Sequence, residues 1–275
     1  MKPSILSILQ IVLAVGALVM SGPARTEFQT QAAARAALWE YSRLIAAEPH
    51  FAVLYTLRGE AYYALDDLPK AVDDYTSAIK LDDFQDKAYF GRGMALGRMG
   101  RVEEAIADLS VFILRHPTDS VAYTKRGVRN IWRNNLVEAE RDLSRAIQLE
   151  PTNAEAHDDL GVVHAKRNRL ALASHHFSAA IRLDPGYQKA YHNLGIVFYM
   201  SGQNQQALDI VDTGLKLAPD SRSTLMLKAM ILQALGETDL AREIEARAEF
   251  LPEANWTERS EVGTPSPTST GREHD

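Results

Sequence analysis

The sequence contains no cysteine, and that absence alone excludes several kinds of chemistry. Disulfide bonds, thiolate metal sites and cysteine nucleophiles all need a residue that is missing here. The GxSxG, phosphate-loop and HExxH patterns of common enzymes are also missing. There is no run of Lys or Arg, and the formal net charge is -6, so nothing favours a nucleic-acid partner. We therefore expect no enzyme, no cofactor and no metal ion.

What the sequence does contain is one spacing, repeated many times. Glycine recurs every 34 residues from Gly59 to Gly195, and alanine does so from Ala71 to Ala241. A fixed period of this size is typical of a repeat array, in which neighbouring copies bury each other's apolar faces. The period divides the chain into five full copies and a weaker sixth, at residues 52–85, 86–119, 120–153, 154–187, 188–221 and 222–254.

Each copy is predicted to hold two helices. In Gln188–Met200, apolar residues at Tyr191, Leu194 and Phe198 fall on one helical face. The fifteenth residue of every copy is of a type that tolerates the left-handed conformation that closes a helix. These residues are Asp66, Gly100, Asn134, Asn168, Gly202 and Gly236. The recurrent glycine and the first alanine are expected where the two antiparallel helices cross, because only small side chains allow a close approach.

These residues resemble the tetratricopeptide repeat, whose pattern is W-x2-L-G-x2-Y, then A-x3-F, then P over 34 residues. One copy matches it with Tyr191, Leu194-Gly195 and Phe198, followed by Ala207, Val211 and Pro219. The resemblance implies an all-α solenoid, a right-handed superhelix whose first helices line a concave groove. It also implies a protein-binding scaffold without catalytic residues. Local departures are Asp83 in place of proline, Phe112 and Gly214 in place of alanine, and Ala229 in place of glycine.

The two ends of the chain differ from the copies. Residues 1–24 have a basic start, an apolar centre and small residues before Arg25, which predicts a secretory signal or an uncleaved membrane anchor. Residues 25–51 predict a helix that covers the open end of the array. Residues 255–275 are poor in apolar side chains and predict a disordered tail. The body is therefore expected in the cell envelope, periplasmic or anchored to the inner membrane.

Two positions of the copies change together. Arg58, Arg92 and Arg126 occupy the seventh place of three copies whose twenty-third place is Asp74, Asp108 or Asp142. Where the seventh place is Leu160 or Leu194, the twenty-third is His176 or Ile210. Helix geometry puts the two places opposite each other, so we predict three bidentate Arg–Asp bridges. The alternative is a ladder of arginines that holds an acidic ligand.

Histidines gather in the fourth copy. They are His157, His164, His175 and His176. A zinc site needs three or four converging ligands, whereas His157 and His164 stand where another copy has Tyr191 and Phe198. We therefore expect imidazoles packed between helices, with a metal-dependent or catalytic envelope protein as the alternative function.

The partner is expected on the face of the first helices that points away from the second helices. An apolar patch with basic flanks, an acidic zone and a third, mixed zone occupy this face, and the basic flanks favour an acidic segment of the partner. The candidate residues are Lys87, Phe90, Met94, Arg98, Lys125, Trp132, Asp158, His192, Asn193 and Tyr199. We expect Trp132 to anchor the ligand, or alternatively to fill a gap between adjacent first helices. The predicted function is a protein-interaction scaffold that binds a protein or peptide. A self-assembling array is a further alternative, and a membrane contact is expected only through residues 1–24.

Overall fold

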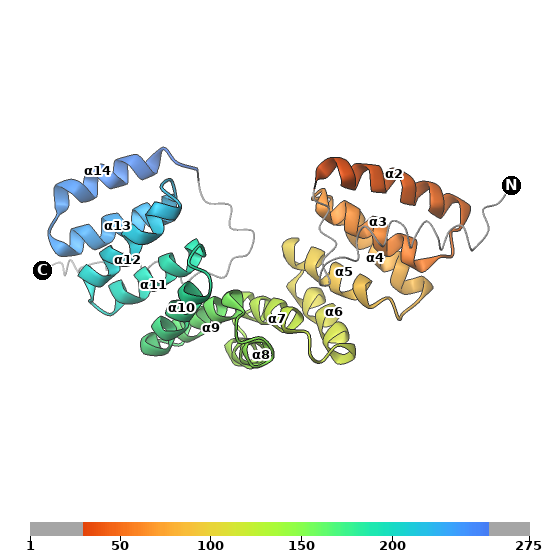
Figure 1. Ribbon diagram of the computed structural model, residues 1–275, viewed down its shortest axis with the longest axis horizontal. Helices are drawn as coiled ribbons and strands as arrows, with labels where there is room; N and C mark the ends of the chain where they lie inside the picture. Colours follow the sequence, from red (N-terminus) through yellow and green to blue (C-terminus); the bar gives the residue numbers. More distant parts are fainter. Residues whose placement is uncertain (1–29, 253–275) are drawn as a thin grey trace, which may run out of the picture. The chain divides into compact units, whose positions relative to one another are not determined.

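The computed structural model describes residues 30–252, and in that range it consists of α-helices joined by short turns, without a strand (Figure 1). The helices are α2 (Gln31–Ala47), α3 (Ala52–Ala64), α4 (Leu68–Leu81), α5 (Asp86–Arg98), α6 (Val102–Arg115), α7 (Ser120–Trp132), α8 (Leu136–Leu149), α9 (Ala154–Lys166), α10 (Leu170–Leu183), α11 (Gln188–Met200), α12 (Asn204–Leu217), α13 (Arg222–Leu235) and α14 (Thr238–Glu249). None of these helices combines the length and the apolar character that crossing a bilayer requires.

The chain divides into two compact units, residues 1–118 and 119–275, and each is described by itself. The first unit contains α2 to α6, and the second contains α7 to α14. The segments predicted as a signal or anchor and as a tail, residues 1–24 and 255–275, lie outside the described residues.

The helices come in antiparallel pairs, one pair for each 34-residue copy. We call α3, α5, α7, α9, α11 and α13 the first helices, and their successors the second helices. Each first helix packs on its second helix, and within a unit the second helix packs on the next copy. First helices of successive copies also touch, as α9 does with α11 and α11 with α13. The all-α solenoid expected from the periodicity is therefore confirmed.

The turn inside each pair uses the conformation predicted from its residue type. The six residues at the fifteenth place all have positive φ, from 56° at Asn168 to 89° at Gly236. Ordinary L-residues avoid this region because their Cβ crowds the backbone, whereas Gly, Asn and Asp reach it at lower cost. The residue type at this place thus ends the first helix in every copy.

The recurrent glycine lies where the two helices of a pair cross. A Cβ placed on Gly161 would be 2.6 Å from the Phe177 ring, and one on Gly195 would be 2.5 Å from Val211 Cγ2. The facing alanines, Ala173 and Ala207, have no exposed surface. The expectation that small residues permit the close approach is confirmed.

The helix before the first copy closes one end of the first unit. Thr30 begins α2 by accepting a hydrogen bond from the Ala33 amide. Tyr41, Leu44 and Ile45 then pack against Leu54 of α3. This contact keeps the apolar face of the first copy out of water, as an end-covering helix must.

All three predicted Arg–Asp bridges are present and bidentate. Arg58 Nε and Nη2 donate to Asp74 at 2.7 and 2.8 Å, and Arg92 binds Asp108 at the same two distances. Arg126 and Asp142 form the third at 2.8 and 2.7 Å. The aspartates are buried, so removing either partner would leave a charge with poor solvation. The Nε–Nη2 edge of each guanidinium is thus occupied by the protein's own carboxylate.

Two of these arginines also link neighbouring helices. Arg58 Nη1 donates to Ser42 of α2 at 3.2 Å, and Arg92 Nη1 donates to Thr76 of α4 at 3.1 Å. Hydrogen bonds to aspartate, opposed by burial, raise the pKa of each arginine further above its ordinary value. Each of these two bridges therefore joins both helices of its copy to the helix that precedes the copy.

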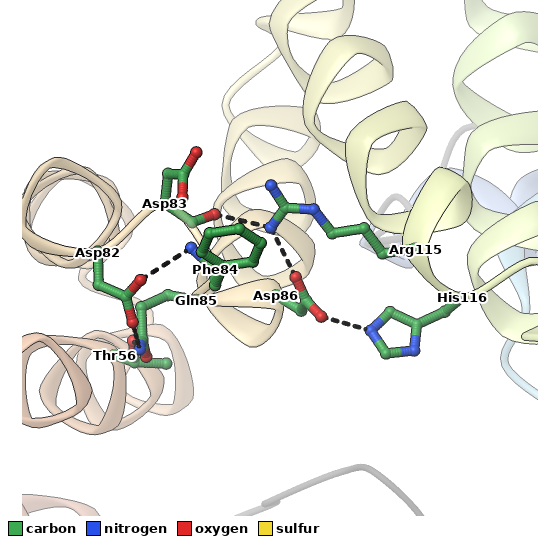
Figure 2. A network of polar contacts seen from close by, with 8 residues as sticks. All are labelled: Thr56, Asp82, Asp83, Phe84, Gln85, Asp86, Arg115 and His116. Carbon is green, nitrogen blue, oxygen red and sulfur yellow. Dashed lines mark hydrogen bonds and ion pairs between the residues drawn. The ribbon is translucent and has the colours of Figure 1, made fainter.

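The junction that lacks the expected proline is held by polar contacts (Figure 2). Asp82 accepts hydrogen bonds from the Phe84 amide at 3.0 Å and from Gln85 Nε2 at 2.6 Å. Arg115 Nη1 donates to Asp83 O and to Asp86 Oδ1, both at 2.7 Å, and packs over the Phe84 ring. A side-chain network thus fixes the turn that proline stiffens in other copies.

The other departures keep the helices close. Phe112, which replaces a small alanine, is buried and stacks on His116 with ring centres 4.5 Å apart. Gly214 allows Tyr191 to approach, because a Cβ there would be 2.9 Å from Tyr191 Cβ. Ala229, in place of glycine, has no exposed surface. The packing accommodates each of these substitutions.

Candidate functional site

Four candidate residues lie on α5 in the first unit. Lys87 is exposed, and Phe90 and Met94 are half-buried. The Phe90 ring lies 5.0 Å from that of Phe112 of α6. Arg98 donates to Asp66 Oδ1 at 2.7 Å and lies over the Tyr63 ring. The Arg98 charge is thus matched within the protein, which leaves Lys87 as the exposed basic residue among these four.

Lys125 and Trp132 lie on α7 in the second unit. Lys125 was expected on an open face, but it is only 7% exposed and forms an ion pair with Glu155 of α9. Its position between two first helices explains the burial, because the next copy covers it. The expectation that Lys125 forms a basic flank for an acidic partner is therefore wrong.

Trp132 is half-buried at the end of α7. The guanidinium of the fully buried Arg129 lies 4.2 Å from the centre of its ring. This is the distance of a cation–π contact, which holds the indole in place. The indole Nε1 is buried and donates no hydrogen bond. Arg129 was missed from the sequence, although its position three residues before Trp132 places the two side chains on one helical face.

Asp158, Asp159 and Asn193 form a buried polar group between α9 and α11, which we call the Asp–Asn group. Asp158 and Asn193 have no exposed surface, although the sequence placed both on an open face. Asn193 Nδ2 donates to Asp158 Oδ1 at 3.0 Å. Lys189 Nζ lies 3.2 Å from Asp158 Oδ2 and 3.3 Å from Asp159 Oδ1. The candidates are thus brought together, but within the contact between first helices.

Burial dominates the electrostatics of this group. It raises the pKa of Asp158, although Lys189 and Asn193 oppose the shift. It also raises the pKa of Tyr187, whose neighbour Asp158 adds to the effect. Lys189 behaves differently, because the two aspartates outweigh burial and raise its pKa well above the ordinary value. The ammonium therefore stays charged, while the ionised form of Asp158 is incompletely stabilised.

His192 and Tyr199 complete the candidates on α11. His192 is buried, and its Nδ1 lies 3.2 Å from Thr224 Oγ1 of α13. Burial lowers the pKa of His192 to about 4, so its imidazole is neutral near pH 7. Tyr199 is half-buried. Thr224 was not among the sequence candidates, because its partner lies one copy away.

The histidines of the fourth copy pack against one another, as expected. His157 Nδ1 and His176 Nδ1 are 3.2 Å apart, and the His164 ring stacks on that of His176 with centres 5.3 Å apart. Burial, followed by the neighbouring imidazoles, lowers the pKa of His176 to about 4. Across residues 30–252, no three His, Cys, Asp or Glu side chains are grouped so that they could hold a metal ion.

A shallow hollow of about 250 Å³ lies between α11 and α12. It is lined by Phe198, Gln206, Asp209, Ile210 and Thr213, none of which is a candidate residue. Its walls offer no converging titratable groups, and we assign it no role.

The comparisons with known proteins agree with this architecture. A stretch of 65 residues matches the protein bimA of Emericella nidulans at 35% identity, which covers 24% of this chain and 8% of that protein. The chain therefore spans only a small part of this relative's length.

Solved structures share the fold at low identity. A tetratricopeptide repeat protein from Parabacteroides merdae superposes with a TM-score of 0.65 at 19% identity, covering 91% of this chain and 93% of that one. YrrB, titled a TPR protein with an unusual peptide-binding site, gives a TM-score of 0.55 at 23% identity, covering 68% and 97%.

Family models extend the agreement to the sequence itself. Models described as tetratricopeptide repeat match residues 56–120, 133–188 and 166–231, which together make up more than half of the chain. With its paired helices and crossing glycines, this chain belongs to the tetratricopeptide repeat family.

Proposed function

We propose that this protein is a non-enzymatic scaffold that binds a partner protein or peptide along its first helices. The family supports the general role, since tetratricopeptide repeat proteins are generally scaffolds without catalysis. The observation that carries the proposal for this chain is the Asp–Asn group. Asn193 Oδ1 is buried there without a hydrogen bond, which is costly unless something uses it.

The location of the group also supports binding by the first helices. Its members come from α9 and α11, and His192 of α11 makes a further buried polar contact with Thr224 of α13. YrrB, which shares the fold, is titled as having a peptide-binding site. A peptide along the first helices would touch successive copies, so several weak contacts would add up.

Position-resolved photocrosslinking tests this proposal. The photoreactive amino acid p-benzoylphenylalanine is placed at Lys87 or at Tyr199, both on first helices. Matched controls carry it at Leu114 and Leu172, which are exposed on second helices. In cells, we expect a discrete partner adduct from the first-helix positions that the controls do not give. Equal adducts at all four positions, or adducts from the controls alone, would refute the placement.

We further propose that the chain is exported and works in the cell envelope. The support is the basic start and uncharged apolar run of residues 1–24, ending in small residues before Arg25. N-terminal sequencing of the mature protein should begin near Arg25. A membrane-bound protein that keeps Met1 would indicate the anchor instead, and a full-length protein in the cytosol would contradict export.

A further inference from the structure

The helix that closes one end of the first unit, α2, has two unlike sides. On one side Tyr41, Leu44 and Ile45 pack against Leu54 of α3. On the other side Trp39 is 70% exposed. In a helix of about 3.6 residues per turn, Trp39 lies nearly opposite Tyr41, so its indole points away from α3. A large apolar ring is thus left in water on the outside of the first unit.

The exposed residues around Trp39 are basic or small. Arg35 and Arg43 lie one turn before and one turn after it, on the same side of the helix. No Asp or Glu of α2 is exposed, and the half-buried Glu40 accepts a hydrogen bond from Arg43 at 2.6 Å. The other exposed residues on this side are Ala32, Ala36, Ala46 and Ala47. We call Trp39, the two arginines and these alanines the outer face of α2.

The outer face is too small to suit a second protein chain. Helix α2 has 17 residues, so it is about 25 Å long and about 10 Å wide. One side of it offers on the order of 250 Å², whereas a stable protein interface buries about 800 Å² per partner. A lipid surface needs no matching protein surface, and helices lie on it through one face. The area therefore favours a membrane over a second copy of this chain.

The residue types of the outer face suit a membrane that contains anionic lipids. Tryptophan is enriched at the boundary between lipid and water, because its ring is apolar while its N–H is polar. Arginine covers apolar surface with its stem and keeps its charge among the headgroups, where anionic lipids attract it. The indole and the two guanidinium groups together thus match an anionic headgroup layer.

The segment before α2 brings the outer face to a membrane. Residues 1–24 contain the uncharged apolar run that predicts a secretory signal or an anchor. Residues 25–30 join this segment to α2 and span at most about 25 Å when extended. An anchor that is kept therefore holds α2 beside the bilayer, where a high effective concentration strengthens even a weak contact. Cleavage near Arg25 leaves the outer face free to bind reversibly.

We propose that α2 docks on the surface of a membrane containing anionic lipids. Trp39 enters the headgroup region, and Arg35 and Arg43 contact lipid phosphates on either side of it. This inference rests on the proposed export, and it adds a membrane contact to the one expected of residues 1–24. Because α2 packs on α3, docking orients the first unit on the membrane instead of leaving it to turn freely.

A dye placed beside Trp39 tests this contact. Because the sequence has no cysteine, the variant Ala36→Cys can be labelled at one position with an environment-sensitive nitrobenzoxadiazole group. The matched control is Ala107→Cys, at an exposed alanine of α6. The protein, as isolated from cells, is combined with vesicles of phosphatidylethanolamine and phosphatidylglycerol. We expect the emission from position 36 to shift to shorter wavelength and that from position 107 to stay unchanged.

Changes to the outer face and to the lipid sharpen the test. Adding Trp39→Ala to the labelled Ala36→Cys variant should abolish most of the shift, and vesicles of phosphatidylcholine alone should give a smaller one. Equal shifts at positions 36 and 107 would overturn the inference, and the same shift on both kinds of vesicle would overturn the selection of anionic lipids. A shift without vesicles that grows with protein concentration would assign the outer face to a second copy and overturn membrane docking.

Failure of docking can be told from failure of export. N-terminal sequencing and fractionation of the same preparation show whether the chain was exported, whereas the dye shows whether α2 docks. A missing shift in an exported chain would contradict docking alone. Export would then stand, and so would partner binding by the first helices, which is measured without lipid.

Discussion

The first three copies and the next two differ in where they bury polar side chains. In residues 52–153 an Arg–Asp bridge crosses each helix pair. In residues 154–221 the same places hold Leu160 with His176 and Leu194 with Ile210. There the strongly buried charges lie instead between first helices, at Asp158 and Lys189. The difference shows that pairing of the helices does not need a buried charge.

This comparison bears on function. In each bridge the aspartate accepts two hydrogen bonds from its own arginine, so both charges are matched within the copy. The Asp–Asn group leaves Asn193 Oδ1 without a hydrogen bond, and the copies around it pack through apolar residues. We therefore attribute its polarity to binding and that of the bridges to structure.

Breaking one bridge should have the largest effect. The variant Asp108→Ile leaves Arg92 without its carboxylate, and we expect a loss of about 3 kcal/mol in the free energy of unfolding. Adding Arg92→Leu recreates the pair that residues 188–221 already use. The double variant should therefore lie within about 1 kcal/mol of the parent in urea titrations. Additive losses in this double-mutant cycle would contradict the equivalence of the two kinds of copy.

Removing Trp132 should affect binding more than folding. Other copies have Arg98 or Met200 at this place, so the fold does not require an indole. For Trp132→Ala we expect capture of the partner to weaken by about tenfold or more, with a small change in melting temperature. The control is Trp39→Ala, at an exposed position of α2. Unchanged capture would end the anchor hypothesis, and a loss of several kcal/mol in stability would favour the gap-filling alternative.

Acidification should lower the stability of residues 154–221 more than that of residues 52–153. Burial lowers the pKa of His157 and His164, and lowers that of His176 to about 4 from an ordinary value of 6.5. Between these values the unfolded chain binds more protons than the folded one, so stability falls as the pH drops from about 6.5 to about 4. At Asp86 burial opposes ionisation, but hydrogen bonds from Arg115 and His116 outweigh it and lower the pKa. The stability that ionised Asp86 contributes is therefore lost only at lower pH.

Hydrogen exchange at pH 7 and pH 5, corrected for intrinsic rates, measures this difference. Protection in α9 and α10 should fall on acidification by roughly 1 kcal/mol, while α3 to α6 change less. The variant His176→Leu should remove part of the fall. A uniform loss across both groups would show that the imidazoles are not its cause.

The smallest effect is expected at the turns. Gly202 has φ of 72° and open space around it, so Gly202→Ala adds only backbone strain. We expect a loss of about 1 kcal/mol. Asn168→Ala, at φ of 56°, should cost less, because asparagine already bears part of that strain. Equal and negligible effects in urea titrations would argue against a conformational role for these residues.

Contacts within one copy could be predicted from the sequence. The turns, the glycine crossings and the Arg–Asp bridges all join places whose spacing repeats along the chain. Because the copies repeat, the residues at the same place can be compared between several copies of one sequence. Helix geometry then determines which places face each other. That is why Arg58 and Asp74 could be paired before the structure was known.

Contacts between copies could not be predicted. Arg98 with Asp66, Lys125 with Glu155 and His192 with Thr224 each join residues about one repeat apart. Such pairs depend on how far one helix pair is displaced against the next, which no pattern within a copy specifies. The expected open face therefore proved to be buried at Lys125, Asp158, His192 and Asn193.

A crystal structure of the full chain with a peptide selected from a random library tests the central claim most directly. The account predicts that the peptide follows the first helices and contacts residues of successive copies. A peptide seated on the second helices would contradict it.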